Sequence, residues 1–212
     1  MITSKKFVIG IDLGGTKVNL AVADLEGKII KEIRTTTKLG RTVLIKQLVY
    51  LIKQIIQKCK LSTQELVAIG IGVPGIADSK NGKVVWAPNL PGWRNVPLRA
   101  AIQKYFPVPI LIENDVDMAA LGEKWKGSGK GKKNLVFIAI GTGIGSGLIL
   151  DGKLYRGTNN VAGAIGWSVV SEERLFKKEF RRCGCLETLS AGPGIAQQAL
   201  KLLKQKITEG VS

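Results

Sequence analysis

Two glycine-rich turns, each lying between apolar segments, constrain the fold of this chain more than any other feature. The first turn, at residues 14–15, separates an apolar run at 7–13 from another at 18–24. The second, at 141–143, interrupts the apolar stretch 135–150. Each arrangement predicts two strands joined by a tight turn. Because the unit occurs twice and each copy feeds helices, the sequence predicts two similar α/β lobes with a cleft between them.

The rest of the first lobe alternates between strand and helix patterns. Apolar spacing predicts strands at 29–37, 66–73 and 108–112, and helices at 41–60, 98–105 and 116–126. Residues 74–97 are rich in Pro, Gly and Asn and predict a long loop containing a hairpin. We expect the first lobe to span residues 1–117 and the second to span 118–212, with a further helix at 201–208.

Both turns have the chemistry of a phosphate loop. Glycines leave backbone N–H groups unobstructed, as a polyphosphate requires. Asp12 precedes the first turn and suits a hydrated Mg²⁺, while Thr16 and Lys17 follow it and suit phosphate oxygens. Neither turn is a Walker A loop. Each could alone be an ordinary hairpin, but two at corresponding places favour phosphate binding.

A third glycine pattern resembles a dinucleotide-binding fingerprint. Gly70 to Gly75 satisfies G-x-G-x-x-G and follows a predicted strand. That fingerprint needs a helix to open at the glycines, and Pro74 with the turn-rich residues after it prevents one. Gly75 is instead expected to let the backbone approach a small ligand.

Asp115 is the best candidate for a general base. The chain contains no histidine, so a base must be a carboxylate, lysine, tyrosine or thiol. Asp115 follows the strand predicted at 108–112, at the end where open α/β sheets collect ligands. It could accept a proton from a sugar hydroxyl while Asn114 orients the ring. The alternative is structural, since Asn or Asp before Val116 would cap the next helix.

Taken in order, these motifs resemble the ROK family (repressor, open reading frame, kinase), and its glucokinase-type sugar kinases in particular. The matching segments are the first phosphate motif at 12–17, the sugar loop at 72–75 and 89–93, the catalytic motif at 113–115, the family signature at 138–147 with 163–166, and the closing Gly-Cys-Leu-Glu at 184–187. The resemblance implies an α/β, actin-like ATPase (ribonuclease H-like) fold of two lobes with mixed sheets and an interlobe cleft.

The same resemblance assigns roles to individual residues. Asp115 would be the catalytic base. The sugar contacts would be Gly75, Asn89, Asn114 and Glu187. The residues serving ATP would be Asp12, Gly14, Gly15, Thr16, Lys17, Gly141, Thr142 and Gly143, with Asp12 reaching Mg²⁺ through water.

The sequence departs from the family at the zinc motif. Zinc-containing members have a sugar-binding glutamate and a zinc-binding histidine where this chain has Ala164 and Trp167. Of the family's cysteine run only Cys185 matches, and Cys183 falls at a non-ligand place. Structural zinc needs four nitrogen or sulfur ligands, so we expect no zinc site. The basic stretch 174–182 is expected to be a solvated face.

The expected function is ATP-dependent phosphorylation of a hexose, with glucose as the family default. A kinase for an N-acetylated hexosamine or another hexose stays open, as does a non-catalytic sugar-binding ROK protein. A sugar-responsive repressor would carry a helix-turn-helix domain before the first phosphate motif, which here begins at Asp12. An actin- or chaperone-like ATPase is a further alternative, but it would not explain the sugar loop with Asn89 and Asn114.

Charge and hydropathy limit the kinds of partner that we expect for this chain. The formal net charge is +16, yet aromatic residues are only 6% of the chain, so no stacking platform for single strands is evident and we expect no specific nucleic-acid partner. No apolar run is long enough for a membrane span or a signal peptide, which predicts a cytoplasmic protein. ROK relatives continue past the point where this chain ends, so we expect an incomplete second lobe. A homodimer is left open.

Overall fold

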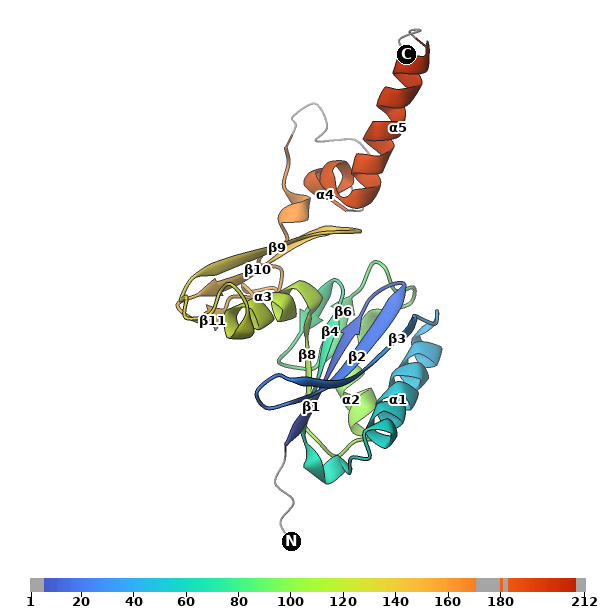
Figure 1. Ribbon diagram of the computed structural model, residues 1–212. Helices are drawn as coiled ribbons and strands as arrows, with labels where there is room; N and C mark the ends of the chain where they lie inside the picture. Colours follow the sequence, from blue (N-terminus) through green and yellow to red (C-terminus); the bar gives the residue numbers. More distant parts are fainter. Residues whose placement is uncertain (1–5, 171–179, 181–182, 209–212) are drawn as a thin grey trace. The chain divides into compact units, whose positions relative to one another are not determined.

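The structure is a computed structural model that describes residues 6–170, 180 and 183–208 (Figure 1). The chain divides between Met118 and Ala119 into two compact units. Helix α3 (Asp115–Lys126) begins in the first unit and continues into the second.

The main sheet of the first unit has five strands, in the order β3-β2-β1-β4-β8. They are β1 (Phe7–Leu13), β2 (Lys17–Asp24), β3 (Ile29–Thr36), β4 (Leu66–Val73) and β8 (Ile110–Asn114). β1 is antiparallel to β2 and parallel to β4, and β4 is parallel to β8. Parallel pairing brings the carboxyl ends of three strands to one edge, where Asp12 lies beside Gly72 and Val73 lies beside Asn114.

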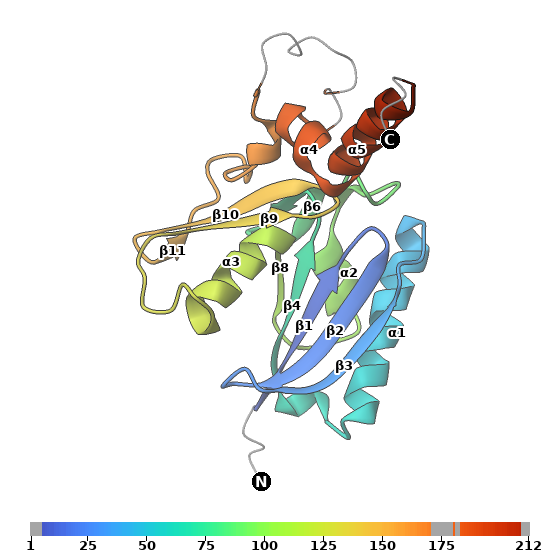
Figure 2. The same ribbon diagram turned by 45° about the horizontal axis from the view of Figure 1, so that its top comes forward.

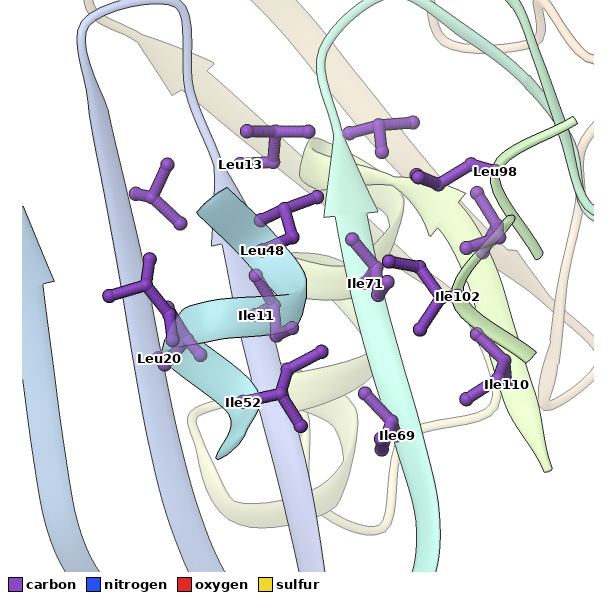
Figure 3. Close-up of a cluster of buried hydrophobic side chains, with 14 of the residues drawn as sticks. Ile11, Leu13, Leu20, Leu48, Ile52, Ile69, Ile71, Leu98, Ile102 and Ile110 are labelled. Atoms are coloured by element: carbon purple, nitrogen blue, oxygen red, sulfur yellow. The ribbon is translucent and has the colours of Figure 1, made fainter. Parts of the chain in front are cut away.

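The hydrophobic core lies between one face of this sheet and two helices, α1 (Arg41–Lys58) and α2 (Leu98–Gln103). Side chains alternate along the strands, so Ile11 of β1 and Ile71 of β4 are buried on this face. Leu48 and Ile52 of α1 and Ile102 of α2 meet them (Figure 3). In Figure 2, α1 runs along the side of the sheet next to β3.

Most of the elements predicted for this unit are confirmed. β1 and β4 have the predicted bounds. Helix α1 begins at the predicted residue but ends at Lys58, two residues early, because Lys60 adopts a left-handed conformation with φ 54°. The N–H of Leu61 then donates to Ile56 O at 3.0 Å and closes the helix end.

The prediction of one long loop at 74–97 is wrong in part. The predicted hairpin exists, formed by β5 (Ile76–Asp78) and β6 (Lys83–Trp86), but β7 (Arg94–Val96) adds a third strand. These short strands form an antiparallel sheet of their own, in the order β5-β6-β7. The loop with Asn89 joins β6 to β7.

The second unit contains a smaller sheet in the order β11-β10-β9. Its elements are β9 (Leu135–Ile140), β10 (Ile144–Leu150), β11 (Lys153–Leu154), the 3₁₀ turn η2 (Ile165–Trp167), α4 (Cys185–Ser190) and α5 (Gly192–Thr208). The predicted second strand–turn–strand is confirmed, with Ile144 paired to Ile140 across the turn. On the edge strand β9, Val136, Ile138 and Ile140 are each more than half exposed.

The C-terminal helix is longer than predicted, since α5 begins at Gly192 and includes the expected 201–208. The basic stretch 174–182 lies outside the described residues, apart from Phe180. Within the described ranges, no helix is both long enough and apolar enough to cross a membrane.

Candidate active site

The first glycine turn joins β1 to β2 and touches the loop that carries Asn89. The N–H of Gly14 donates to Lys17 O at 2.9 Å, and the hydroxyl of Thr37 donates to Gly14 O at 2.8 Å. A Cβ on Gly15 would lie 2.9 Å from the Cβ of Asn89, so only glycine permits this approach. The fold thus brings a predicted phosphate residue beside a predicted sugar residue.

Asp12, the expected magnesium residue, is exposed at the carboxyl end of β1 and is held by Asn19. Asn19 lies opposite Asp12 in the β1–β2 pair, and its Nδ2 donates to Asp12 Oδ2 at 3.0 Å. The Oδ1 of Asn19 is buried, with no hydrogen-bond partner in the part of the chain that is described. The water molecules around a hydrated Mg²⁺ donate hydrogen bonds to carboxylate and amide oxygens, so Asp12 and Asn19 fit the ion. Thr16 and Lys17 are exposed nearby on the same hairpin.

Nothing in the sequence motifs singles out Asn19. A signal was nevertheless present, because Asn19 is a neutral polar residue in the middle of an apolar strand. With a two-strand hairpin centred between Gly15 and Thr16, antiparallel register places Asn19 directly across from Asp12.

Asn114 ends β8 and caps α3. Its Oδ1 accepts hydrogen bonds from Val116 N at 2.9 Å and Asp117 N at 3.0 Å, which is the N-cap arrangement. Its Nδ2 donates to Gly75 O at 2.8 Å. The strand predicted at 108–112 exists but lies two residues later, because its pairing with β4 begins at Ile110 and continues as far as Asn114 opposite Val73. The helix-capping alternative therefore holds for Asn114, and Asp115 becomes the first helical residue.

Gly75, a predicted sugar contact, needs to be glycine at this point. Its φ is +84°, and a Cβ there would collide with the carbonyl oxygen of Trp86. The hydrogen bond from Asn114 fixes its carbonyl. The sugar loop and the catalytic motif are thus joined directly through Gly75 and Asn114.

The carboxyl group of Asp115 is largely buried at the start of α3. Its Oδ1 accepts a hydrogen bond from Val116 N at 2.9 Å. Burial is the largest influence and raises the pKa of Asp115 to about 6; the hydrogen bond from Val116 opposes the rise, and the negative charge of Asp12 adds to it. A carboxylate that titrates close to neutral pH is well matched to general-base catalysis.

Close packing explains why α3 can start at this place. A Cβ on Gly72 would lie 3.0 Å from the Sδ of Met118 and 3.4 Å from the Cα of Asp115. Because β4 has glycine here, the first turn of α3 sits against the sheet next to the carboxyl end of β1, where Asp12 lies.

The second glycine turn, in the second unit, is supported by Glu187. The N–H of Gly141 donates to Gly143 O at 2.9 Å, and the turn places Thr142 at its tip. Glu187 Oε2 accepts a hydrogen bond from Ile144 N at 2.7 Å, and it would lie 2.6 Å from a Cβ on Gly143. Glu187, assigned to the sugar by resemblance, therefore also braces the predicted phosphate turn.

The positions that depart from the zinc motif lie in the second unit. Ala164 and Trp167 are both exposed, Cys185 is buried and Cys183 is partly buried. No cluster of three or more His, Cys, Asp or Glu side chains that could hold a metal ion occurs among the residues described.

The sequence pattern of the ROK family matches residues 8–210. A glucokinase of Halalkalibacterium halodurans is 34% identical over 211 residues, which cover 99% of this chain and 61% of that enzyme.

The chain belongs to the ROK family.

Regulators of this family are equally similar to the chain. A xylose repressor of Caldicellulosiruptor bescii is 35% identical over 207 residues, covering 95% of this chain and 51% of the repressor. Among solved structures, a ROK glucokinase from Streptomyces griseus in complex with glucose and AMPPNP matches with a TM-score of 0.79 and 30% identity. That match covers 95% of this chain and 64% of the glucokinase chain.

These relatives establish the fold as the actin-like ATPase fold of ROK sugar kinases. The chain spans between 51% and 64% of the length of the three relatives described.

Proposed function

We propose that this ROK chain transfers the γ-phosphoryl group of ATP to a hydroxyl group of a hexose. The observation that carries the proposal is the environment of Asp115. Its pKa is raised to about 6, it opens helix α3, and its neighbour Asn114 is bonded to the sugar-loop residue Gly75. Burial disfavours the charged form of a carboxylate, so it does not help one whose role is only structural. A general base benefits, because burial raises its proton affinity.

The proposed reaction is an in-line displacement at phosphorus. The hexose hydroxyl gives its proton to the carboxylate of Asp115 as its oxygen bonds to the γ-phosphorus. The bond from that phosphorus to the β–γ bridging oxygen breaks, and its electron pair leaves with ADP. The protonated Asp115 then releases its proton to solvent, which a pKa of about 6 allows at neutral pH.

Several other residues would bind the nucleotide. In the first unit these are Gly14, Gly15, Thr16 and Lys17, through backbone N–H groups, a hydroxyl and an ammonium. In the second unit they are Gly141, Thr142 and Gly143. Mg²⁺, when bound, would neutralise charge on the phosphates. Asp12 would hold it through water, with Asn19 fixing the carboxylate.

The hexose would be oriented by Asn89, Asn114, Gly75 and Glu187. Glu187 already uses Oε2 on Ile144 N, so Oε1 is the oxygen that we assign to a sugar hydroxyl. Glucose is the first substrate to test, because glucokinases are among the relatives and one was solved with glucose and AMPPNP. N-acetylated hexosamines and other hexoses remain in the panel, because Ala164 and Trp167 alter the family's sugar motif.

A coupled assay of ADP release with a panel of hexoses tests the proposal. We expect sugar-dependent turnover by the whole chain, and a fall of about 10²–10⁴-fold in kcat for Asp115→Asn, which removes the base. The matched variant Asp151→Asn, on an exposed turn of the second unit, should keep its activity. ADP release that no hexose stimulates would refute the kinase proposal.

A second candidate is a sugar-binding ROK protein without turnover. It is favoured by Ala164 and Trp167, and by the similarity to the xylose repressor of Caldicellulosiruptor bescii. Calorimetry separates the two candidates, because this one predicts saturable heat with a sugar and no ADP release in its presence.

A further inference from the structure

The guanidinium group of Arg99, in the first turn of α2, binds main-chain carbonyls from two separate segments. Nε donates to Ile110 O at 3.0 Å, at the start of β8. Nη1 donates to Lys80 O at 3.0 Å and Nη2 donates to Ser79 O, both in the turn between β5 and β6. One rigid, charged fork thus joins the β5–β6 turn to the strand that ends in Asn114.

The backbone and the turn geometry reinforce this attachment. The N–H of Arg99 donates to Gly82 O at 3.0 Å. Gly82 has φ +66°, and a Cβ there would collide with the side chain of Arg99. The turn therefore packs closely against Arg99, and this packing requires glycine at position 82.

A second link runs from the same turn to the catalytic motif. The hydroxyl of Ser79 donates to Glu113 Oε1 at 2.7 Å. Glu113 is buried and its Oε1 also accepts the N–H of Asn114 at 3.2 Å. The turn is thus connected to the residue that precedes Asp115 by way of a buried carboxylate.

These links hold the sheet β5-β6-β7 at two places. Just before β5, Gly75 is held by Asn114; at the far end, the β5–β6 turn is held by Arg99 and Glu113. The loop with Asn89 leaves the same sheet between β6 and β7. The sheet also packs into the core through Ala77, Val84 and Val96. Without its attachment at the far end it could shift on this core and carry Asn89 away from Gly15, which it now touches.

We propose that Arg99 is a positioning residue for the sugar site: by fastening the β5–β6 turn to β8, it sets the place of the Asn89 loop relative to Asn114 and Asp115. This role rests on the proposed sugar-kinase function. The hydrogen bonds of Arg99 reach none of the nucleotide residues, and only Gly15 among them touches the Asn89 loop, so we expect loss of Arg99 to affect the sugar more than ATP.

The test compares Arg99→Met with Arg99→Lys, which keeps the charge and loses the fork. The matched control is Arg94→Met, at an exposed position that begins β7. We expect Arg99→Met to raise the KM for the hexose about tenfold, because misplaced binding groups lose orientation, and to change the KM for ATP less than about twofold. Arg99→Lys should fall between it and the wild type. Arg94→Met should change neither value.

Hydrogen exchange gives a readout that needs no substrate. Amides of residues 83–96 should exchange about tenfold faster in Arg99→Met, while those of β1 and β2 stay protected; uniform loss of protection would indicate general destabilisation and overturn the proposal. Should Arg99→Met not fold, Arg99→Lys and Ser79→Ala are measured in the same way.

The outcomes separate the two proposals. If the wild type phosphorylates no hexose, the kinase proposal fails and the exchange of residues 83–96 alone decides the role of Arg99. If Arg99→Met has the hexose KM of the wild type, or if hydrogen exchange in residues 83–96 is unchanged, the proposed role of Arg99 is overturned.

Discussion

Asp115→Asn should make the protein more stable at neutral pH while removing the proposed base. Folding raises the pKa of Asp115 from its ordinary 3.8 to about 6, mainly by burial, so the ionised form is disfavoured in the folded state. At 1.36 kcal/mol per pH unit, this difference amounts to about 3 kcal/mol. Asparagine carries no charge and keeps an oxygen for the N–H of Val116, so the variant should recover much of this free energy.

The pH dependence follows from the same two pKa values. For a carboxyl group whose folded pKa is raised, the destabilisation is complete above about pH 6 and disappears below 3.8. We therefore expect the free energy of unfolding of Asp115→Asn to exceed that of the wild type by roughly 2–3 kcal/mol at pH 7.5, about 1 kcal/mol at pH 4.5 and only about 0.2 kcal/mol at pH 3.5.

Urea unfolding at these three pH values measures the difference directly. Asp151→Asn is the control, because Asp151 is exposed with φ 49°, a conformation that asparagine adopts readily, and its substitution should change little at any pH. A wild type at least as stable as Asp115→Asn at pH 7.5, or a difference that persists at pH 3.5, would show that burial does not disfavour the charge of Asp115.

Three further predictions concern the site. If Asp115 is the base, kcat/KM for the hexose should rise with pH through about 6 and then level off; a profile that is flat between pH 5 and 8 would exclude it. Gly15→Ala should weaken hexose binding and cost about 1–3 kcal/mol in unfolding free energy, because its Cβ would overlap the Asn89 loop, whereas Gly10→Ala, with open space around its Cβ, should have little effect on either. Glu187→Ala leaves a backbone N–H in the second turn without its acceptor and should cost about 1–3 kcal/mol, measured by urea unfolding, while Glu187→Gln keeps an acceptor and should cost less.

The sequence predicts well where local patterning and burial agree. Strands β1 and β4 are predictable to the residue because mainly apolar segments end at a glycine turn or a proline. The second hairpin was predictable for the same reason, since the glycines at 141 and 143 separate β9 from β10.

The sequence predicts poorly where a strand is held by distant partners. The end of β8 was misplaced because Glu113 and Asn114 are polar, although pairing with β4 and contacts with Ser79 and Gly75 keep them in the strand. The sequence predicts the β5–β6 hairpin but not the third strand β7, because these strands are only three or four residues long and the β5–β6 turn depends on Arg99.

The candidate site follows the same division. Motif spacing is enough to single out Asp12, the glycines of both turns and Asp115. Asn19, which holds Asp12, and Arg99, which fastens the β5–β6 turn to β8, act through strand register and through main-chain carbonyl groups that no motif records.

The central claim is that Asp115 accepts the proton of a hexose hydroxyl during phosphoryl transfer. Its most direct test is a single-turnover measurement of phosphate transfer from γ-labelled ATP to glucose, comparing the wild type with Asp115→Asn after calorimetry has matched their sugar saturation. We expect sugar phosphate from the wild type and a rate at least about 10²-fold lower from the variant at equal saturation. Equal transfer rates from both proteins would contradict it.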